Sequence, residues 1–245
     1  MKSEKILGVK IDNLSKKEIK EKINFYLFNQ KNKTHQIATI NPEFILLAQK
    51  NKVFKEVLNK SSLKVTDGFG IKVAFWLKRK KNKTRWTGVD LLNYILFLSN
   101  KNNLKIFLLT NKKGLSLWKE TAQAIEKKYP YLLIRGYDYE IKLDNTTIKN
   151  IQDKVKNSQA DILFCNWGAP QQEIILSYLV NANISLKLVM GVGGSFDFLT
   201  QKLKRAPLWM RKIGLEWLYR FYQQPWRWKR IFNATIVFLW KVIKS

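Results

Sequence analysis

The sequence predicts an α/β protein, a Rossmann-like and mostly parallel sheet with helices on both faces, followed by a helical carboxyl-terminal appendage. Short apolar runs rich in Val, Ile, Leu and Phe alternate with longer amphipathic segments, the pattern of strands and helices in a doubly wound sheet. Near residue 200 acidic residues almost vanish and Trp accumulates. We therefore expect an α/β domain over residues 1–201 and an appendage over residues 202–245.

Seven apolar runs are predicted to be strands, at residues 6–11, 36–40, 63–66, 105–109, 132–135, 161–165 and 187–190. The amphipathic segments between them predict helices at residues 16–28, 71–78, 89–100, 114–128, 146–157 and 171–180, and a helix pair across 43–59. Parallel strands joined in this way place all their carboxyl ends at one edge of the sheet, where ligands bind in open α/β folds.

The chain is strongly basic, with 45 Lys and Arg against 18 Asp and Glu and a net charge of +27. Such a charge attracts polyanions in general, whether nucleic acid, anionic lipid or phosphorylated sugar. The single cysteine, Cys165, excludes an internal disulfide and fits a reducing compartment. The first residues have charges on both sides of a very short apolar run, so we expect neither a signal peptide nor an anchor, and a cytoplasmic protein.

The appendage combines cations with large aromatic residues. From Lys202 onward there are eleven Lys and Arg, one acid (Glu216) and five of the nine Trp. This mixture favours the headgroup layer of a membrane, and the apolar run at residues 234–240 is far shorter than the roughly 20 residues that span a bilayer. We therefore expect the appendage to lie on a membrane; the alternative is an ordinary terminal helix whose aromatic residues pack on the core.

A helix that begins near Pro225 would have one largely apolar face. That face is predicted to contain Trp228, Ile231, Phe232, Thr235, Ile236, Leu239, Val242 and Ile243. Arg220, Arg227 and Arg230 also belong to this basic region, and the last two lie one turn apart, so their guanidinium groups could converge on a diphosphate. Solvated surface arginines are the alternative.

Polar residues follow several predicted strands. Asp67 comes directly after an apolar run and could be a general base, although Asp-Gly is also a common turn. Thr39 and Asn41 lie on the same side of the second strand, and Asn41 before Pro42 could equally be a helix cap. These residues indicate a cleft at the carboxyl ends of the strands.

Two glycine-containing turns lie at the same edge. Gly168 precedes a proline and a predicted helix with Gln172, a geometry whose free amides could receive a phosphate or ribose. Gly191 and Gly193 lie in a turn that permits close backbone approach, but it lacks the Lys of a P-loop, and a tight turn explains it equally well. His35 is the only histidine and no nucleophile elbow is present, which argues against a Ser-His-Asp hydrolase. The sequence has no pair of His or Cys residues that would indicate a metal site.

Six motifs in order resemble the WecG/TagA/CpsF glycosyltransferases over about residues 35–232. They are Thr39-Ile40-Asn41-Pro42, Thr66-Asp67-Gly68-Phe69-Gly70, Arg85-Trp86-Thr87-Gly88-Val89-Asp90-Leu91, Gly168-Ala169-Pro170-Gln171-Gln172-Glu173, Gly191-Val192-Gly193-Gly194-Ser195-Phe196-Asp197, and Arg205-Ala206-Pro207 with Gly214-Leu215-Glu216-Trp217-Leu218-Tyr219-Arg220.

The resemblance implies an inverting enzyme that moves N-acetylmannosamine, or a related sugar, from a UDP-sugar to polyprenyl-diphosphate-linked N-acetylglucosamine at the cytoplasmic membrane face, in wall teichoic acid or other surface polysaccharide synthesis. It implies no cofactor, no obligatory metal and no nucleic-acid partner, and it is compatible with a homo-oligomer that hides the appendage. Residue by residue, it makes Asp67 the base, places Thr39, Asn41, Arg85 and Gln172 in the substrate pocket, and assigns Arg220, Arg227 and Arg230 to the lipid diphosphate.

Three departures from the family pattern bear on the donor sugar. Thr110-Asn111 and Gln201 stand where glycine is usual, and Trp167 replaces a smaller aliphatic residue. Two rival functions remain. A nucleic-acid-binding protein, supported by charge and aromatic residues, predicts steeply salt-dependent RNA or DNA binding without turnover. A noncatalytic membrane scaffold predicts that Asp67 can be replaced by Asn without loss.

Overall fold

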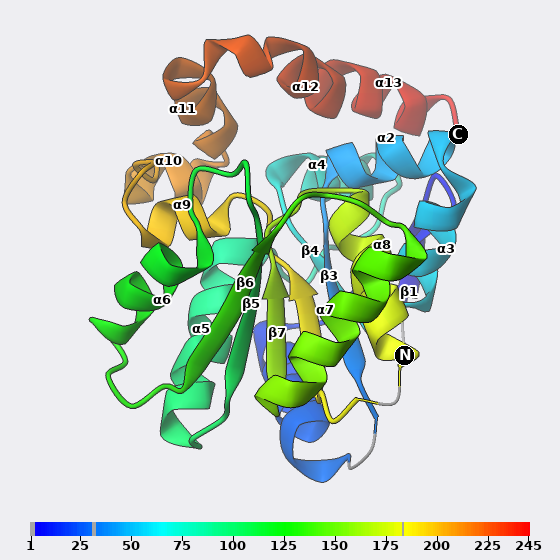
Figure 1. Cartoon of the computed structure of the whole chain (residues 1–245). Coiled ribbons are helices and arrows are strands. Elements are labelled where there is room, and N and C mark those ends of the chain that lie inside the picture. The colour runs from blue at the N-terminus through cyan, green and yellow to red at the C-terminus, as the bar shows by residue number, and fades with distance from the viewer. Residues whose placement is uncertain (1–2, 31–32, 183) are drawn as a thin grey trace.

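The computed structural model describes residues 3–30, 33–182 and 184–245, except for the side chain of Arg227. Within this part, the main sheet has six strands, all parallel, in the order β4-β3-β8-β7-β5-β6 (Figure 1). Their bounds are β3 His35–Ile40, β4 Leu63–Thr66, β5 Ile106–Asn111, β6 Ile134–Tyr139, β7 Ile162–Cys165 and β8 Leu188–Gly191. The predicted α/β fold with a mostly parallel sheet is confirmed.

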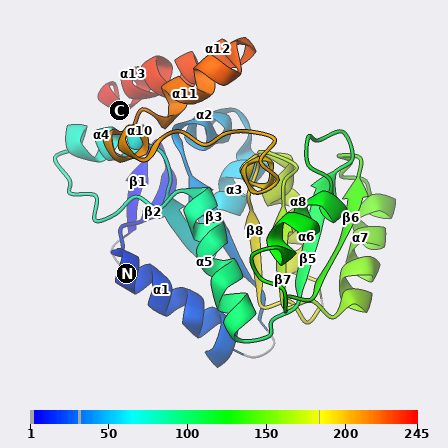
Figure 2. The same ribbon diagram turned by 90° about the vertical axis from the view of Figure 1, so that its left-hand side faces the viewer.

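Helices cover both faces of this sheet, as Figure 2 shows. One face packs against α1 (Lys16–Asn24), its π-helical continuation η1 (Phe25–Asn29), α5 (Gly88–Lys101) and α6 (Trp118–Glu126). The other packs against α2 (Pro42–Lys50), α3 (Lys52–Lys60), α7 (Asn145–Ser158) and α8 (Gln171–Val180). Successive strand residues alternate between the faces: Leu108 and Phe164 belong to the first core, whereas Leu109 and Cys165 belong to the second.

The first predicted strand, at residues 6–11, is wrong. The chain instead forms an antiparallel hairpin of β1 (Ser3–Ile6) and β2 (Val9–Asp12), separate from the main sheet. Leu7 and Gly8 have φ of 48° and 76°, which reverses the chain in two residues. A leucine at positive φ interrupts no apolar pattern, so the periodicity did not reveal this turn.

The helix predicted at residues 114–128 is shorter than expected, because α6 begins only at Trp118. Residues 112–117 form a loop in which Gly114 N–H donates to the Asn111 carbonyl at 2.8 Å. The Trp118 N–H donates to Asp138 Oδ1 at 2.9 Å, which fixes where the helix starts. Gly114 and Leu115 of this loop are therefore free to line the cleft described below.

The segment after residue 201 forms a series of short helices. They are α10 (Leu208–Ile213), α11 (Glu216–Gln223), η2 (Pro225–Arg227), α12 (Trp228–Phe232), η3 (Asn233–Val237) and α13 (Phe238–Ile243). The helices from α11 to α13 arch over α2 and α4 (Phe69–Leu77) at one end of the molecule in both Figures 1 and 2. Where the described residues form helices, none combines the length and apolar character needed to cross a bilayer. The boundary at residues 201 and 202 remains a prediction.

The helical region from Pro225 forms as expected, but the face that packs inward differs. Phe238, which was not assigned to the apolar face, is fully buried with Val242 against α2 and α4. Phe232 and Ile236, which were assigned to it, are 50% and 58% exposed. The region is apolar on both sides, so periodicity alone could not decide which side meets the core. A Cβ on Gly70 would lie 2.7 Å from Pro42 Cγ, so the absence of a side chain there mainly allows the close approach of α2 to α4.

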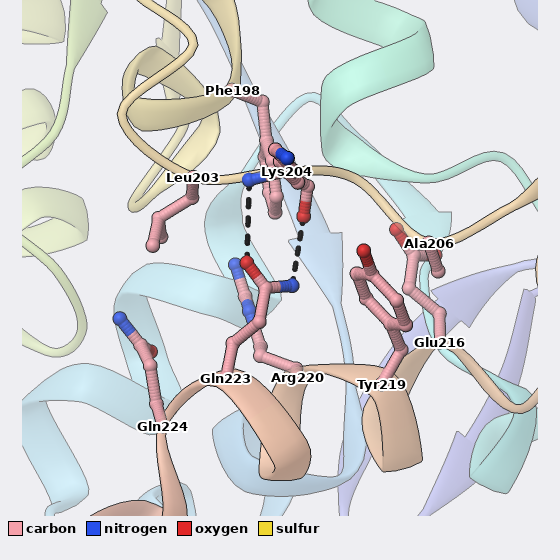
Figure 3. Close-up of a pocket in the computed structure, with 9 residues that line it drawn as sticks. All are labelled: Phe198, Leu203, Lys204, Ala206, Glu216, Tyr219, Arg220, Gln223 and Gln224. Atoms are coloured by element: carbon pink, nitrogen blue, oxygen red, sulfur yellow. Dashed lines mark hydrogen bonds between the residues drawn. The ribbon is translucent and has the colours of Figure 1, made fainter.

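Side-chain contacts also fasten α11 to the segment of the chain before it. Figure 3 shows Gln223 of α11 facing Lys204, with the Gln223 amide donating to the Lys204 carbonyl at 2.9 Å and accepting from its N–H at 3.3 Å. Arg220 rises from the same helix, with its guanidinium carbon 5.3 Å from the centre of the Phe198 ring. The orientation of α11 relative to the sheet is thus fixed near the carboxyl ends of the strands.

Candidate active site

A cavity of about 480 Å³ lies between the carboxyl ends of the strands and the appendage. Its lining includes ten of the eleven predicted site residues: Thr39, Asn41, Asp67, Arg85, Gly168, Gln172, Gly191, Gly193, Arg220 and Arg230. The side chain of the eleventh, Arg227, lies outside the described residues. Strand ends that are far apart in sequence therefore meet at one cavity, and the appendage supplies part of its wall.

Asp67 lies where β4 ends, beside the beginning of α5. Its N–H donates to the Ile40 carbonyl at 2.8 Å, which continues the strand pairing by one residue. Its Oδ2 accepts from the N–H of Gly88, the first residue of α5, at 3.2 Å. A helix amino terminus carries partial positive charge, so this contact favours a carboxylate.

Two hydroxyl groups lie near the same point. A Cβ placed on Gly88 would be 3.6 Å from Asp67 Oδ2, 3.6 Å from Thr39 Oγ1 and 3.9 Å from Ser195 Oγ. These three oxygens come from the ends of β4 and β3 and from the first residue of α9 (Ser195–Leu199). These oxygens thus surround one point beside Gly88, and of the three groups Asp67 is the one that can be a base near neutral pH.

The surroundings raise the pKa of Asp67 to about 6. Burial is the largest cause, because it disfavours the charged carboxylate, and the Glu216 carboxylate acts in the same direction. The Gly88 N–H and the Arg85 guanidinium lower the pKa, but by less. A group with this pKa is mostly ionised at pH 7 and is a much stronger base than an ordinary aspartate.

Asn41 caps α2, since its Oδ1 accepts from Phe44 N–H at 2.9 Å. The helix-cap interpretation of this residue therefore holds, and Asn41 lines the cavity as well. Cap and wall are compatible because the side-chain amide has a second, nitrogen end that can face a ligand.

The two glycine turns are held together by Gln172. Gly168 and Gly193 have φ of 79° and 48°, and Gln172 Oε1 accepts from their N–H groups at 3.0 and 3.1 Å. Gln172 is only 2% exposed, so its amide is used within the protein although the residue borders the cavity. Gly191 touches the same side chain, because a Cβ there would lie 2.5 Å from Gln172 Nε2.

Arg85 connects the sheet to the appendage. It donates to the Arg211 carbonyl at 3.0 Å and contacts Glu216 Oε2 at 3.5 Å. Arg205 holds the other oxygen of Glu216 at 3.3 Å and also bonds to Asp90 Oδ1 at 2.7 Å. No role was predicted for Glu216, Arg205 and Asp90. The available signals were their place in the shared motifs and the fact that Glu216 is the single acid of a basic segment.

The two described arginines of the predicted diphosphate site have different environments. Arg220 reaches the turn after β8, where a Cβ on Gly194 would lie 3.4 Å from its Nη2. Arg230 instead makes a two-pronged pair with Glu43, with Nε to Oε1 at 2.8 Å and Nη2 to Oε2 at 2.9 Å. A diphosphate that binds Arg230 would have to compete with this carboxylate.

The three departures from the family pattern lie outside the cavity wall. Trp167 Nε1 donates to the Thr110 carbonyl at 3.2 Å, so two of them contact each other. Thr110 is fully buried, and its hydroxyl donates to Asp138 Oδ1 at 2.6 Å. Gln201 has φ of 60°, a conformation that glycine adopts without strain. Among the residues described, no group of three or more His, Cys, Asp or Glu side chains could hold a metal ion.

Comparisons with known proteins agree with the motif resemblance. The model of the glycosyl transferase WecG/TagA/CpsF family matches residues 4–245. The chain is 32% identical over 200 residues to the N-acetylglucosaminyldiphosphoundecaprenol N-acetyl-beta-D-mannosaminyltransferase of Bacillus subtilis (strain 168), covering 80% of this chain and 75% of that protein. It is 31% identical over 245 residues to the protein of the same name from Staphylococcus aureus (strain MRSA252), covering 98% of this chain and 92% of that protein. The chain therefore belongs to the WecG/TagA/CpsF family and is a glycosyltransferase.

Proposed function

We propose that this enzyme transfers N-acetylmannosamine from a UDP-sugar to N-acetylglucosamine linked to a polyprenyl diphosphate, with inversion at the anomeric carbon and without an obligatory metal. The names of the relatives from B. subtilis and S. aureus support the sugar, the acceptor and the β linkage. UDP-sugars of this type carry an α-linked nucleotide, so a β product requires inversion. The product belongs to wall teichoic acid or another surface polysaccharide.

The observation that carries the proposal is Asp67 in the cavity with a pKa of about 6. A single displacement needs one base to remove the proton of the acceptor hydroxyl. The hydroxyl oxygen then forms a bond to the anomeric carbon as the bond from that carbon to the UDP oxygen breaks. The proton passes to Asp67 and the electron pair leaves with UDP.

The leaving diphosphate needs positive charge, which the cavity can provide. The amino terminus of α8, directly after the turn that contains Gly168, supplies partial positive charge there. In our assignment the pocket for the sugar nucleotide and acceptor is lined by Thr39, Asn41, Arg85, Gln172 and the glycines at 168, 191 and 193. Arg220, Arg227 and Arg230 are assigned to the lipid diphosphate, with Arg230 exchanging Glu43 for the ligand.

The acceptor lipid implies work at a membrane surface. Trp209, Tyr222 and Trp226 of the appendage are 61%, 85% and 71% exposed, and cations lie between them in the sequence. Exposed indoles and cations together favour the anionic headgroup layer of the cytoplasmic face. We propose that the enzyme binds there as a peripheral protein; a homo-oligomer that covers the appendage away from lipid remains an expectation.

The direct test is release of UDP from UDP-N-acetylmannosamine in the presence of EDTA, with a lipid-diphosphate N-acetylglucosamine acceptor. We expect acceptor-dependent turnover, a β-linked product by NMR, and loss of turnover in Asp67→Asn. Absence of turnover with a panel of UDP-sugars, together with salt-dependent RNA binding, would favour the nucleic-acid-binding alternative. Equal turnover of the native chain and Asp67→Asn would remove Asp67 from the role of base.

A further inference from the structure

Two turns of the cavity wall depend on one buried side-chain amide. The turns follow β7 and β8, and Gln172 Oε1 receives an N–H from each, Gly168 at 3.0 Å and Gly193 at 3.1 Å. At both glycines a Cβ would meet no atom within 4 Å, so the turns face open space. Gln172 therefore sets the distance between two backbone segments that border the cavity.

This arrangement requires the Gln172 amide to have one orientation. If the amide were rotated by half a turn, its nitrogen would face two N–H groups and all three donors would lack an acceptor. Each buried polar group left without a partner costs about 1–3 kcal/mol. In the observed orientation Nε2 needs an acceptor of its own, and Glu173 Oε1 provides it at 2.7 Å.

Glu173 is an unusual residue for this purpose. It is 1% exposed, and within the described part of the chain its second oxygen, Oε2, has no hydrogen-bond partner. Burial raises the pKa of its carboxyl group to about 8, so the group is mostly neutral at pH 7. A buried carboxyl group with an unused oxygen lowers stability, and groups with strongly perturbed pKa values cluster at functional sites.

The pair lies against β8, whose last residue, Gly191, also lines the cavity. α8 packs against β8 and β3, and a Cβ on Gly191 would lie 2.5 Å from both Gln172 Nε2 and Glu173 Oε1. On the other side, the Gln36 side chain of β3 donates to the Glu173 carbonyl at 3.1 Å. The pair is thus buried between α8 and the strands β3 and β8.

We propose that Glu173 is a positioning residue of the transferase site: it orients the Gln172 amide, which in turn fixes the glycine turns that receive the sugar nucleotide. The role of the turns as the wall of the donor pocket rests on the proposed function. The hydrogen-bonded connection from Glu173 through Gln172 to Gly168 and Gly193, which we call the brace, does not. Glu173 lies outside the cavity lining and acts only through Gln172.

Two substitutions separate this role from simple packing. Glu173→Gln keeps a neutral acceptor of the same shape, so we expect the KM for the UDP-sugar and the affinity for UDP to stay within about threefold of the native values. Glu173→Leu fills the same space but removes the acceptor. For that variant we expect the donor KM and the dissociation constant of UDP to rise by roughly tenfold, with a smaller change in kcat.

A control variant and a structural measurement complete the test. Ile175→Val loosens the buried face of α8 without touching the pair, and it should leave the donor KM unchanged even if it lowers the melting temperature as much as Glu173→Leu. In ¹⁵N-glycine-labelled protein, amide hydrogen exchange at Gly168 and Gly193 should be faster in Glu173→Leu than in Glu173→Gln.

The outcomes are distinguishable. Unchanged exchange at both glycines in Glu173→Leu would overturn the brace, whatever the enzyme transfers. Faster exchange with native UDP affinity would overturn the link between the brace and the donor. A native chain that binds no UDP contradicts the proposed function, and the exchange measurement then still decides whether Glu173 orients Gln172. Equal damage from Gln and Leu at position 173 would also contradict the proposal.

Discussion

The sheet and the appendage use similar residues for opposite purposes. In the sheet, large apolar side chains are buried, and the polar residues at the strand ends are bonded to other parts of the protein. In the appendage, large apolar side chains such as Trp209, Tyr222 and Trp226 are exposed, and just over half of the exposed large apolar residues in the described chain lie between residues 208 and 243. Monomeric proteins rarely expose so much apolar surface without a partner.

The cavity therefore has one rigid side, formed by the sheet, and one attached side, formed by the appendage. Asp67 and the glycine turns belong to strand ends, whose positions the sheet determines. Arg220 and Glu216 arrive from α11, which is joined to the rest through Arg85, Arg205 and the Gln223–Lys204 pair. We expect chemistry to depend on the first side and access to lipid on the second.

The largest expected effect concerns the rigid side. Asp67→Asn removes the proposed base while keeping the shape of the side chain, so kcat should fall by about 10²–10⁴-fold. Donor affinity should change little, because the substitution leaves the glycine turns intact. Asp153→Asn, on the exposed surface of α7, is the matched control and should retain native kcat. A loss of less than tenfold in Asp67→Asn would show that the base lies elsewhere.

The next effect concerns the attached side. Replacing Trp209 and Trp226 together by Ser should weaken partitioning onto anionic vesicles at least about tenfold, since each exposed indole contributes to interfacial binding. The melting temperature should stay nearly native because neither ring packs in the core. Tyr131 is also strongly exposed but lies outside the appendage, so Tyr131→Ser is the control when sedimentation with vesicles is measured. Native partitioning of the double variant would contradict our assignment of the membrane surface.

The pH dependence of catalysis tests the electrostatics of the cavity. The pKa of Asp67 is about 6, above the ordinary value, so the base is ionised at pH 7 and protonated as the pH falls through 6. We expect kcat/KM to decrease about tenfold per pH unit once the pH is well below 6. A pH–rate profile in a constant-ionic-strength buffer measures this. A flat profile down to pH 5 would mean that the carboxylate keeps an ordinary pKa in the working enzyme.

The smallest effect is on stability. The folded protein holds the Asp67 pKa near 6, above the unfolded value near 3.8. The unfolded chain therefore ionises this group first, and the folded protein loses stability progressively as the pH rises from about 4 to 6. Asp67→Asn should therefore stabilise the protein at pH 7 by roughly 1–3 kcal/mol, with no gain below about pH 4. Urea unfolding at the two pH values measures the difference; a destabilised variant at pH 7 would contradict the assigned burial cost.

Local patterns were sufficient for the elements that repeat a simple period. β4 and α8 have the predicted bounds of residues 63–66 and 171–180, because each has a clear apolar pattern between strong boundary residues. The hairpin at residues 3–12 was missed, since its turn uses a leucine at positive φ instead of a recognisable glycine pair. The start of α6 was also misplaced, because an exposed loop can share the polarity of a helix.

The residues of the candidate site were predictable in a different way. Their place at strand ends followed from parallel topology, and their identities followed from motifs shared with a family. Their contacts did not follow: Arg230 meets Glu43 at a separation of 187 positions, and Arg85 meets Glu216 at 131. The departures at Thr110 and Trp167 proved to contact each other behind the wall, which no local pattern indicates.

The sequence alone predicts the α/β alternation, the edge of the sheet at which polar residues gather, and the basic aromatic character of the appendage. These properties depend on neighbours in the chain, through periodicity, turn chemistry and composition. Tertiary structure decided the strand order, the side of the final helix that meets the core, the raised pKa of Asp67, and the bracing of two turns by Gln172 and Glu173. Those properties depend on burial and on partners distant in sequence, which exist only once the chain has folded.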